Sequence, residues 1–162
     1  MALVEISLRL PNRPGALAGV ARSLAENRIN VAAISVEATS NRGTVRLVVS
    51  DPARAVRLLE ESGLKPSTGE LLPVHLEERT GSLLQVLDCL AAARINVRYV
   101  TLLVQRDGAR VLVALGVSSP KKALAALRKA GYYSSGAEGL VSNSDLVAAA
   151  PSIPSESVGL LL

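Results

Sequence analysis

The chain has 162 residues, of which 49% are hydrophobic, and its net charge is +4. This length fits one medium domain or two small ones, and the apolar content excludes wholesale disorder. The single cysteine excludes an internal disulfide, and no apolar stretch reaches the roughly 20 residues that span a bilayer, so we expect a soluble, cytoplasmic protein without membrane partners. The basic residues form no run, so we expect no nucleic-acid partner.

The first 68 residues predict six elements, because hydrophobic periodicity changes several times between the period of a strand and that of a helix. Residues 4–10 alternate apolar and polar side chains, as a half-buried strand does. The next segment carries apolar residues at helical spacing, from Leu17 to Leu24. The expected elements are a strand at 4–10, a helix at 14–28, strands at 30–38 and 44–50, a helix from Pro52 to Gly63, and a short edge strand at 64–67.

The same pattern recurs 66 residues later, where "RPGALAGVARSLAENRINV" (13–31) aligns with "RTGSLLQVLDCLAAARINV" (79–97). After the next strands the offset becomes 68, so Pro52 aligns with Pro120 and Gly63 with Gly131. A fixed period of this kind indicates one structural unit used twice. We therefore expect a first domain at 1–68 and a second at 69–135, with a short polar hinge at 67–71 and the last strand at 132–135.

The element order βαββαβ, repeated, predicts an α+β fold of two ferredoxin-like units that pack as one antiparallel sheet with the helices on one face. A tail at 136–162 is rich in Ser, Ala, Gly and Pro, and we expect it to be flexible, with one helical turn after Asn143 or Ser144. Open sheet edges and a helix-free sheet face would favour a homodimer.

The strand-to-helix turn "NRPGAL" has two interpretations. In the structural one, Pro14 sets φ for the helix start and Gly15 permits a tight bend. In the functional one, Gly15 also lets a ligand approach the first N–H groups of the helix, which bind carboxylates well. The second unit keeps Gly81 at the matching position and replaces the proline by Thr80.

These residues resemble the ACT domain: a strand, "RPGAL", a helix that ends in "RINV", and the βαββαβ order, twice at a fixed offset. The resemblance covers 3–67 and 71–135 and is nearest to small proteins that consist of two ACT units without a catalytic domain. It implies a regulatory, amino-acid-binding module. In the family, units pair side by side into an eight-stranded sheet with four helices on one face, and ligands lie between the turn of one unit and the second strand of the other.

Carried over residue by residue, the resemblance nominates ligand-binding residues in both units. They are Asn12, Arg13, Pro14, Gly15, Ala16, Leu17, Asn30 and Val31 in the first unit, and Glu78, Arg79, Thr80, Gly81, Ser82, Leu83, Asn96 and Val97 in the second. The family's acidic residue at the turn is Asn12 here and Glu78 in the second unit, so we expect the two sites to differ. The lack of aromatic residues for stacking favours an aliphatic ligand.

Other functions find little support in the sequence. His75 is predicted to lie on the sheet surface and Cys89 to be a structural thiol, and we expect no metal, no cofactor and no catalytic activity. RNA binding on an open sheet requires aromatic residues that the expected central strands lack. Two alternatives to the sensor remain: an oligomerisation or regulatory subunit of a partner enzyme, with degenerate ligand sites, and a small enzyme.

Overall fold

The structure, a computed structural model, describes residues 3–107, 110–133 and 142–145. Along the described residues its elements follow the predicted order, with six strands in place of the eight expected. They are β1 (Leu3–Pro11), α1 (Ala16–Glu26), β2 (Val31–Ala38), β3 (Arg42–Val49), α2 (Pro52–Glu61), β4 (Ser67–Glu77), α3 (Ser82–Ala92), β5 (Val97–Asp107), β6 (Arg110–Val117) and α4 (Pro120–Lys129).

The strands form one antiparallel sheet in the order β2-β3-β1-β4-β6-β5, and β4 is shared by both units. Its first half pairs with β1, where Leu3 lies opposite Leu71, and its second half pairs with β6. Of the edge strand expected at 64–67, only Ser67 lies in a strand; it begins β4, which continues without a break into the first strand of the second unit. The hinge predicted at 67–71 is wrong: Ser67 to Glu70 are polar because they are exposed strand residues, and the chain does not turn there.

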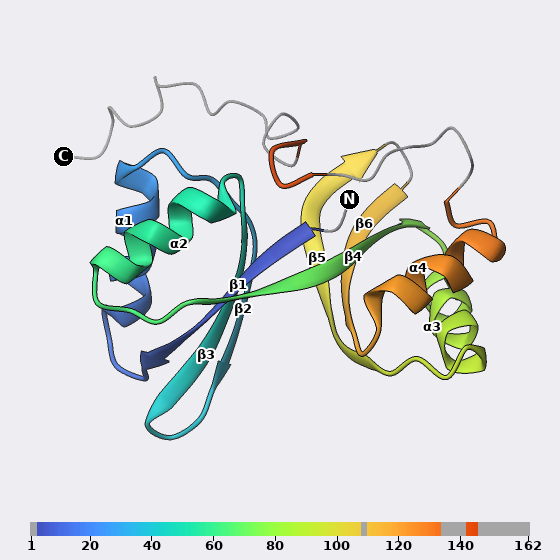
Figure 1. Cartoon of the computed structure of the whole chain (residues 1–162), viewed down its shortest axis with the longest axis horizontal. Coiled ribbons are helices and arrows are strands. Elements are labelled where there is room, and N and C mark those ends of the chain that lie inside the picture. Colours follow the sequence, from blue (N-terminus) through green and yellow to red (C-terminus); the bar gives the residue numbers. More distant parts are fainter. Residues whose placement is uncertain (1–2, 108–109, 134–141, 146–162) are drawn as a thin grey trace.

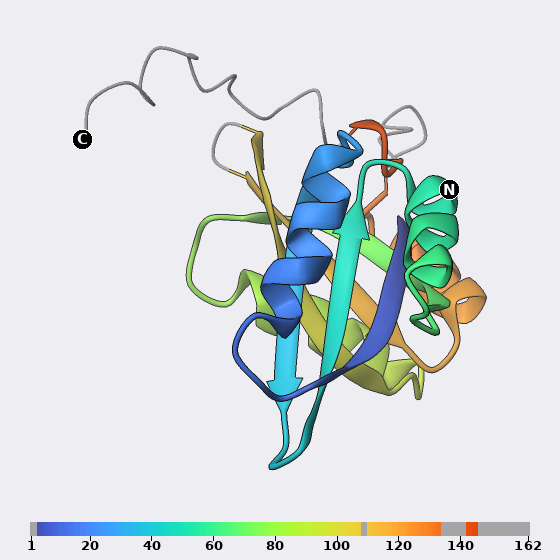
Figure 2. The ribbon, with the colours of Figure 1, turned by 90° about the vertical axis from the view of Figure 1, so that its left-hand side faces the viewer.

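All four helices lie on one face of this sheet, which confirms the predicted fold class. Ile6 of β1 lies opposite Thr68 of β4, so the two side chains are on the same face of the sheet. Because every second residue of a strand shares a face, Leu72 and Val74 of β4 also lie on the face of Ile6. In the first unit the face packs on α1 and α2, and in the second on α3 and α4 (Figure 1). Figure 2 shows α1 and α2 on the outer side of the first unit's strands. Each fully buried Leu in these two cores stabilises the fold by about 2 kcal/mol.

The sheet is strongly coiled, so that the helix-free face of the first unit packs against the helix-free face of the second. Figure 1 shows the result, with the two helix pairs at opposite ends of the molecule and the strands between them. This seam is a third core, with Tyr99 packed against it, and comprises Leu3, Ala32, Ala33, Val48, Leu71, Leu103, Leu112 and Ala114. The expectation that the helix-free face is open for dimerisation is wrong at this end of the sheet, because its residues there are apolar and already buried.

Each helix ends in a left-handed residue followed by an apolar one. At the end of α1, Arg28 has φ 56°, and the N–H of Ile29 donates to the carbonyl of Leu24 at 2.9 Å. Arg94 (φ 55°) takes the same conformation after α3, so both "RINV" motifs are helix stops of the Schellman type. Gly63 and Gly131 take this position after α2 and α4, as the sequence predicts for Gly63.

The end of the second unit differs from its prediction. Where a last strand was expected at 132–135, Tyr132 and Tyr133 form bends, and the Tyr133 hydroxyl donates to the carbonyl of Pro73. Residues 134 and 135 lie outside the described residues, as does most of the expected flexible tail. The described tail residues, 142–145, form a turn in which the N–H of Asp145 donates to the Ser142 carbonyl at 3.1 Å. No helix in the described part of the chain is long and apolar enough to cross a membrane.

Candidate ligand-binding turns

The turn between β1 and α1 holds six of the nominated residues, Asn12 to Leu17. Gly15 immediately precedes α1 with φ 85°, a left-handed conformation that favours glycine. A Cβ at Gly15 would meet no atom within 4 Å, so the space above it is open. No side-chain hydrogen bond caps α1, and its first N–H groups lie at the positive end of the helix dipole. Such a turn can accept a carboxylate.

Hydrogen bonds attach this turn to the hairpin between β2 and β3. The Asn12 N–H donates to the carbonyl of Asn41 at 3.1 Å, and its Nδ2 donates to the carbonyl of Thr39 at 3.0 Å. The Asn12 side chain therefore holds the turn in place. This contact engages one amide hydrogen of Asn12, which is an exposed residue.

The second turn repeats the backbone of the first. Gly81 has φ 89° before α3, again without a side-chain cap, and the N–H of Ser82 donates to the carbonyl of Arg79 at 3.3 Å, as Ala16 does to Arg13. The replacement of Pro14 by Thr80 thus leaves the turn geometry intact. The side chains differ: Arg79 donates through Nε to Glu77 at 2.6 Å and through Nη2 to Gln85 at 3.0 Å.

The strand openings form a second matched pair. The N–H of Asn30 donates to Oγ of Ser50 at 3.0 Å, and the N–H of Ser50 donates back to the Asn30 carbonyl at 2.9 Å. Asn96 and Ser118 repeat both bonds at 3.1 and 2.9 Å. Both Asn residues are exposed, whereas the following residues, Val31 and Val97, are half-buried.

The single chain does not assemble these parts into one pocket. Within a unit, the turn and the strand opening lie at opposite ends of an 11-residue helix, which is about 16 Å long. Between units, the β1–α1 turn and the β4–α3 turn stand on opposite outer sides of the molecule (Figure 1).

Comparison with known proteins assigns the family. A model of the ACT domain pair matches residues 1–114, which include both turns and both strand openings. The chain belongs to the ACT domain family. The two repeats are therefore ACT units, as the resemblance implied.

Solved structures share the fold of these ACT units. Protein BT0572 from Bacteroides thetaiotaomicron is 24% identical, with a TM-score of 0.79 over 90% of this chain and 96% of that one. The ligand-free regulatory subunit of aspartate kinase from Thermus thermophilus is 19% identical, with a TM-score of 0.58 over 82% and 93% of the two chains. A structure of aspartokinase alpha and beta subunits is 20% identical, with a TM-score of 0.54 over 80% and 93%. Among curated proteins, none matches this sequence.

Two apolar patches lie at equivalent places on the ACT units. Ile34 and Val36 lie opposite Leu47 and Val45 in the sheet and therefore face the helix side, yet each is half exposed because β2 is an edge strand. Leu17, Ile34 and Val36 are the exposed large apolar residues of the first unit, here called the first patch, and Leu83, Leu84, Val100 and Leu102 are those of the second unit, here called the second patch. In the described part of the chain, these seven residues are all of the exposed large hydrophobic side chains.

The seam between the ACT units contains a polar cluster that the sequence did not predict. The Tyr99 hydroxyl donates to Oε1 of the buried Glu5 at 2.7 Å, and the Arg46 guanidinium lies 4.7 Å from the centre of the Tyr99 ring. Burial raises the pKa of Glu5, an effect that the Tyr99 hydrogen bond and nearby guanidiniums oppose. Burial and the Glu5 contact raise the pKa of Tyr99 to about 12. The partners are 94 residues apart, so no local pattern reveals them.

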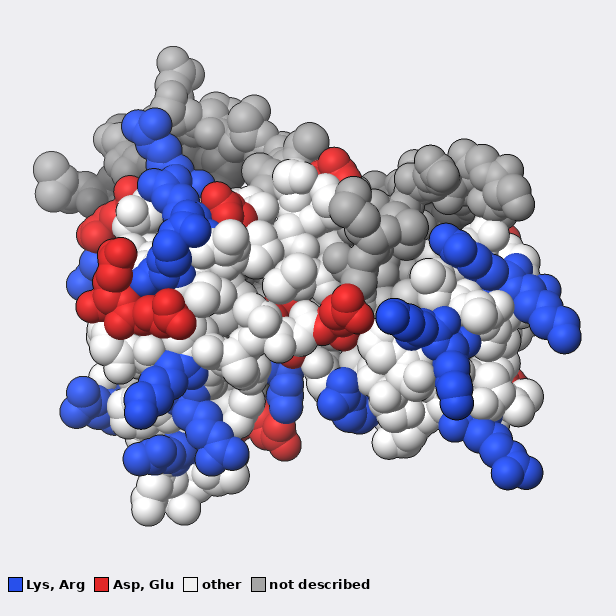
Figure 3. Space-filling model, viewed as in Figure 1, with Lys and Arg blue, Asp and Glu red and all other residues white. Residues whose placement is uncertain are grey.

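Charged side chains outside the seam are spread over both ACT units. In the view of Figure 3, basic side chains occur on both halves of the molecule, and acidic ones lie mainly on the left half and near the centre. This distribution agrees with the dispersed charges of the sequence and with a solvated surface.

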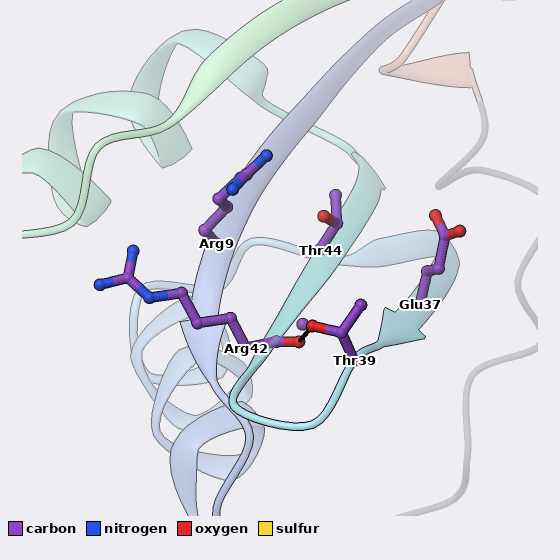
Figure 4. A pocket seen from close by; sticks show the side chains of 6 residues that line it. Arg9, Glu37, Thr39, Arg42 and Thr44 are labelled. Carbon is purple, nitrogen blue, oxygen red and sulfur yellow. Dashed lines mark hydrogen bonds between the residues drawn. The ribbon is translucent and has the colours of Figure 1, made fainter.

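A shallow pocket adjoins the first turn. It lies at the β2–β3 hairpin, and Figure 4 shows Arg9 and Arg42 on one side with Thr39, Thr44 and Glu37 on the other. The Thr39 hydroxyl donates to the carbonyl of Arg42 at 2.7 Å, which stiffens the hairpin to which the first turn is bonded.

The remaining candidates have structural surroundings. Cys89 packs against the second core, with its Sγ 3.7 Å from the carbonyl of Ala126, as predicted for a structural thiol. His75 is half-buried in β4. Asp51 caps α2 by accepting from the N–H of Arg54 at 3.0 Å.

Proposed function

We propose that this protein is a non-catalytic, cytoplasmic regulator that binds a small amino acid. The observation that carries the proposal is the pair of uncapped helix starts at Gly15 and Gly81, each left-handed and each open above the backbone. Two turns keep this geometry although their side chains differ, which favours a role for the backbone N–H groups themselves. Membership of the ACT family supports a regulatory, ligand-binding role.

The ligand's groups have chemically suitable partners. The carboxylate would accept from the N–H groups of Gly15 and Leu17, or of Gly81 and Leu83. The ammonium would donate to carbonyls and to the side-chain amide oxygen of Asn30 or Asn96, which are exposed residues. An aliphatic side chain would lie against the apolar patches, which begin at Leu17 and Leu83, next to the turns.

We propose that a second copy of the chain completes each site. The two apolar patches are repeat equivalents, and both border sheet edges, β2 and β5. A two-fold dimer that pairs the first patch of one chain with the second patch of the other covers both patches at once. It would also bring the turn of one unit to the strand opening of another, which a single chain does not do.

A thermal-shift screen against the twenty amino acids tests the proposal. A ligand that binds only the folded state stabilises it by about 2.7 kcal/mol at a hundred times its dissociation constant. We expect one amino acid to raise the midpoint, and Gly15→Val or Gly81→Val to abolish the effect. Gly131→Val is the matched control for Gly15→Val, and Gly63→Val for Gly81→Val, because each control glycine is equally left-handed (φ 86° and 79°) but lies in the other unit. If no amino acid shifts the midpoint, the amino-acid sensor is excluded.

The second candidate is an oligomerisation or regulatory subunit for a partner enzyme, with degenerate ligand sites. It is favoured by the side chains of the turns, since Asn12 is bonded to Thr39, and Arg79 to Glu77 and Gln85. A protein of this kind would show no amino-acid shift, yet substitution of the patch residue Leu102 by Asp would abolish its association.

A further inference from the structure

The described part of the tail contacts the first ACT unit through one side chain, Asn143. Its Nδ2 donates to the carbonyls of Val4 at 2.9 Å and Val49 at 2.8 Å, and its Oδ1 accepts from the N–H of Val4 at 2.8 Å. Asn143 is only 8% exposed. All three partners are main-chain groups, so the unit offers a niche made of backbone alone.

The chemistry of this niche matches a primary carboxamide. The β1–β3 ladder begins with Glu5 opposite Val48, and Val4 and Val49 lie one step beyond, where the amide of Asn143 fills the gap between the strands. The niche offers one N–H donor and two carbonyl acceptors. A carboxamide supplies one acceptor oxygen and an NH₂ with two hydrogens, whereas a carboxylate has no donor and an ammonium or guanidinium has no acceptor.

In the second ACT unit, the carbonyl that corresponds to that of Val49 accepts a hydrogen bond from a residue of the same unit. The repeat equivalent of Val49 is Val117, and its carbonyl accepts from Nη2 of Arg98 at 2.9 Å. The residue that matches Arg98 in the first unit is Ala32, which has no donor side chain. Only the first unit therefore depends on the tail at this place.

The tail turn is held by its own hydrogen bonds. Oδ2 of Asp145 accepts from the N–H of Ser142 at 2.8 Å and from its hydroxyl at 2.6 Å. These bonds are local to the tail, so the turn can leave the niche without breaking them or the sheet. The hydrogen bonds of Asn143 to the first unit are therefore separate from the hydrogen bonds that hold the turn together.

We propose that residues 142–145 form a displaceable latch, in which Asn143 fills a main-chain niche for a primary carboxamide on the first ACT unit. When the latch opens, the N–H of Val4 and the carbonyls of Val4 and Val49 become free. Val49 lies opposite Val31 in the sheet, so the latch sits one strand from the opening of β2. The latch would thus regulate the first unit and not the second.

One consequence rests on the proposed function. If an amino acid held at Asn30 and Val31 shifts β2 relative to β3, the Val49 carbonyl opposite Val31 shifts with it. Its binding would alter the latch, and opening the latch would alter its affinity by the same factor. The test of the latch itself needs no ligand, so the two proposals can fail separately.

Hydrogen exchange of individual amides, measured by NMR on the full chain, tests the latch. In the wild type, the Val4 amide should exchange more slowly than in Asn143→Ala by at least about tenfold, yet faster than core amides such as Leu47. Asn143→Asp keeps the shape and the acceptor but loses the donor, so it should release Val4 as fully as alanine does. Arg98→Ala is the matched control and should leave the Val4 amide unchanged.

Three results would overturn the proposal. If Val4 exchanges at the same rate in the wild type and in Asn143→Ala, the contact is not populated. If Asn143→Ala accelerates exchange of the Leu47 and Val4 amides equally, the tail is an integral part of the fold and no latch exists. The same conclusion follows if the Val4 amide of the wild type exchanges as slowly as the Leu47 amide. If Asn143→Asp protects Val4, the niche has no preference for a carboxamide.

Discussion

The two ACT units contribute to one seam, and they build equivalent halves of it from different residues. In each unit the same two strand positions lie opposite each other, as Ala33 and Val48 in the first and as Tyr99 and Gly116 in the second. The repeat equivalent of Glu5 is Leu71, which is fully buried. One half of the seam is therefore apolar, and the other holds a large ring above a glycine and bonded to a carboxylate.

This difference teaches that the repeat keeps the positions and the strand pairing of these residues but not their chemistry. Tyr99 can cross β6 only because Gly116 has no side chain, whereas Ala33 leaves room for the Val48 side chain. A seam whose halves are unlike also distinguishes the two units, because the Glu5–Tyr99 bond can form on one side only. The pairing of the units is thus specified by a polar contact as well as by apolar burial.

The largest effect is expected for Gly116→Val, which places the first unit's residue in the second. A Cβ at Gly116 would lie 2.6 Å from Cε1 of Tyr99, far inside van der Waals contact. The ring would have to move away from Glu5 as well, and we expect a loss of about 3 kcal/mol in the free energy of unfolding, measured by urea denaturation.

The double variant Gly116→Val with Tyr99→Ala rebuilds the first unit's pair and sharpens this comparison. Its destabilisation should be smaller than the sum of the two single losses by more than about 1 kcal/mol, because the clash exists only when both large side chains are present. Additive losses would show that Tyr99 and Gly116 do not constrain each other.

The second effect concerns the Glu5–Tyr99 bond, which has no counterpart in the other half of the seam. Tyr99→Phe leaves the buried carboxylate without this donor and should cost about 2 kcal/mol at pH 7. The pKa of Glu5 is raised above the value of 4.5 that the unfolded chain would have. Between these two pKa values the folded state binds more protons, so stability falls as pH rises through this window.

Loss of the hydrogen bond raises the pKa of Glu5 further, so the cost of Tyr99→Phe should grow as pH rises through that window. Glu5→Gln keeps an acceptor for Tyr99 without a charge and is the control, whose stability should lose this pH dependence. Equal slopes of stability against pH for the wild type and Glu5→Gln would contradict the assignment.

The sequence predicted the fold because its signals were local and repeated. Alternation in residues 4–10, helical spacing from Leu17 to Leu24 and two "RINV" stops each report on a few neighbouring positions. The hinge at 67–71 failed for a physical reason: polar residues occur both in turns and on exposed strands, and composition alone does not separate them. Continuity of β4 follows from its pairing with β1 and β6.

The candidate turns were likewise predictable from neighbouring residues, and Gly15 and Gly81 have the left-handed backbone expected of glycine at a tight turn. The seam cluster and the Asn143 contact were not predictable, because their partners are 94 and 139 residues apart along the chain. Nothing near Glu5 or Asn143 in the sequence distinguishes them from solvent-exposed polar residues. Only the packing of one unit on the other, and of the tail on the first unit, supplies their partners.

A smaller effect is expected at the helix ends, where both units contrast arginine with glycine. Arg28 and Arg94 take a left-handed backbone that costs a side-chain-bearing residue about 1 kcal/mol, whereas Gly63 and Gly131 take it freely. Arg28→Gly and Arg94→Gly should therefore each stabilise the protein by about 1 kcal/mol, seen as a higher thermal midpoint. Gly63→Ala should have the opposite sign, and a stabilising result for it would contradict the argument.

The smallest effect compares the starts of α2 and α4, which are repeat equivalents with Pro at the first turn. Asp51 caps α2 through the N–H of Arg54, whereas Ser119 makes no side-chain hydrogen bond at α4. Asp51→Ala should cost roughly 0.7 kcal/mol and Ser119→Ala almost nothing, because only the first removes a cap. Ser119→Asp should then gain part of that amount by copying the first unit's cap. If Ser119→Ala is as costly as Asp51→Ala in urea unfolding, both helices are capped, and the units are alike at this position.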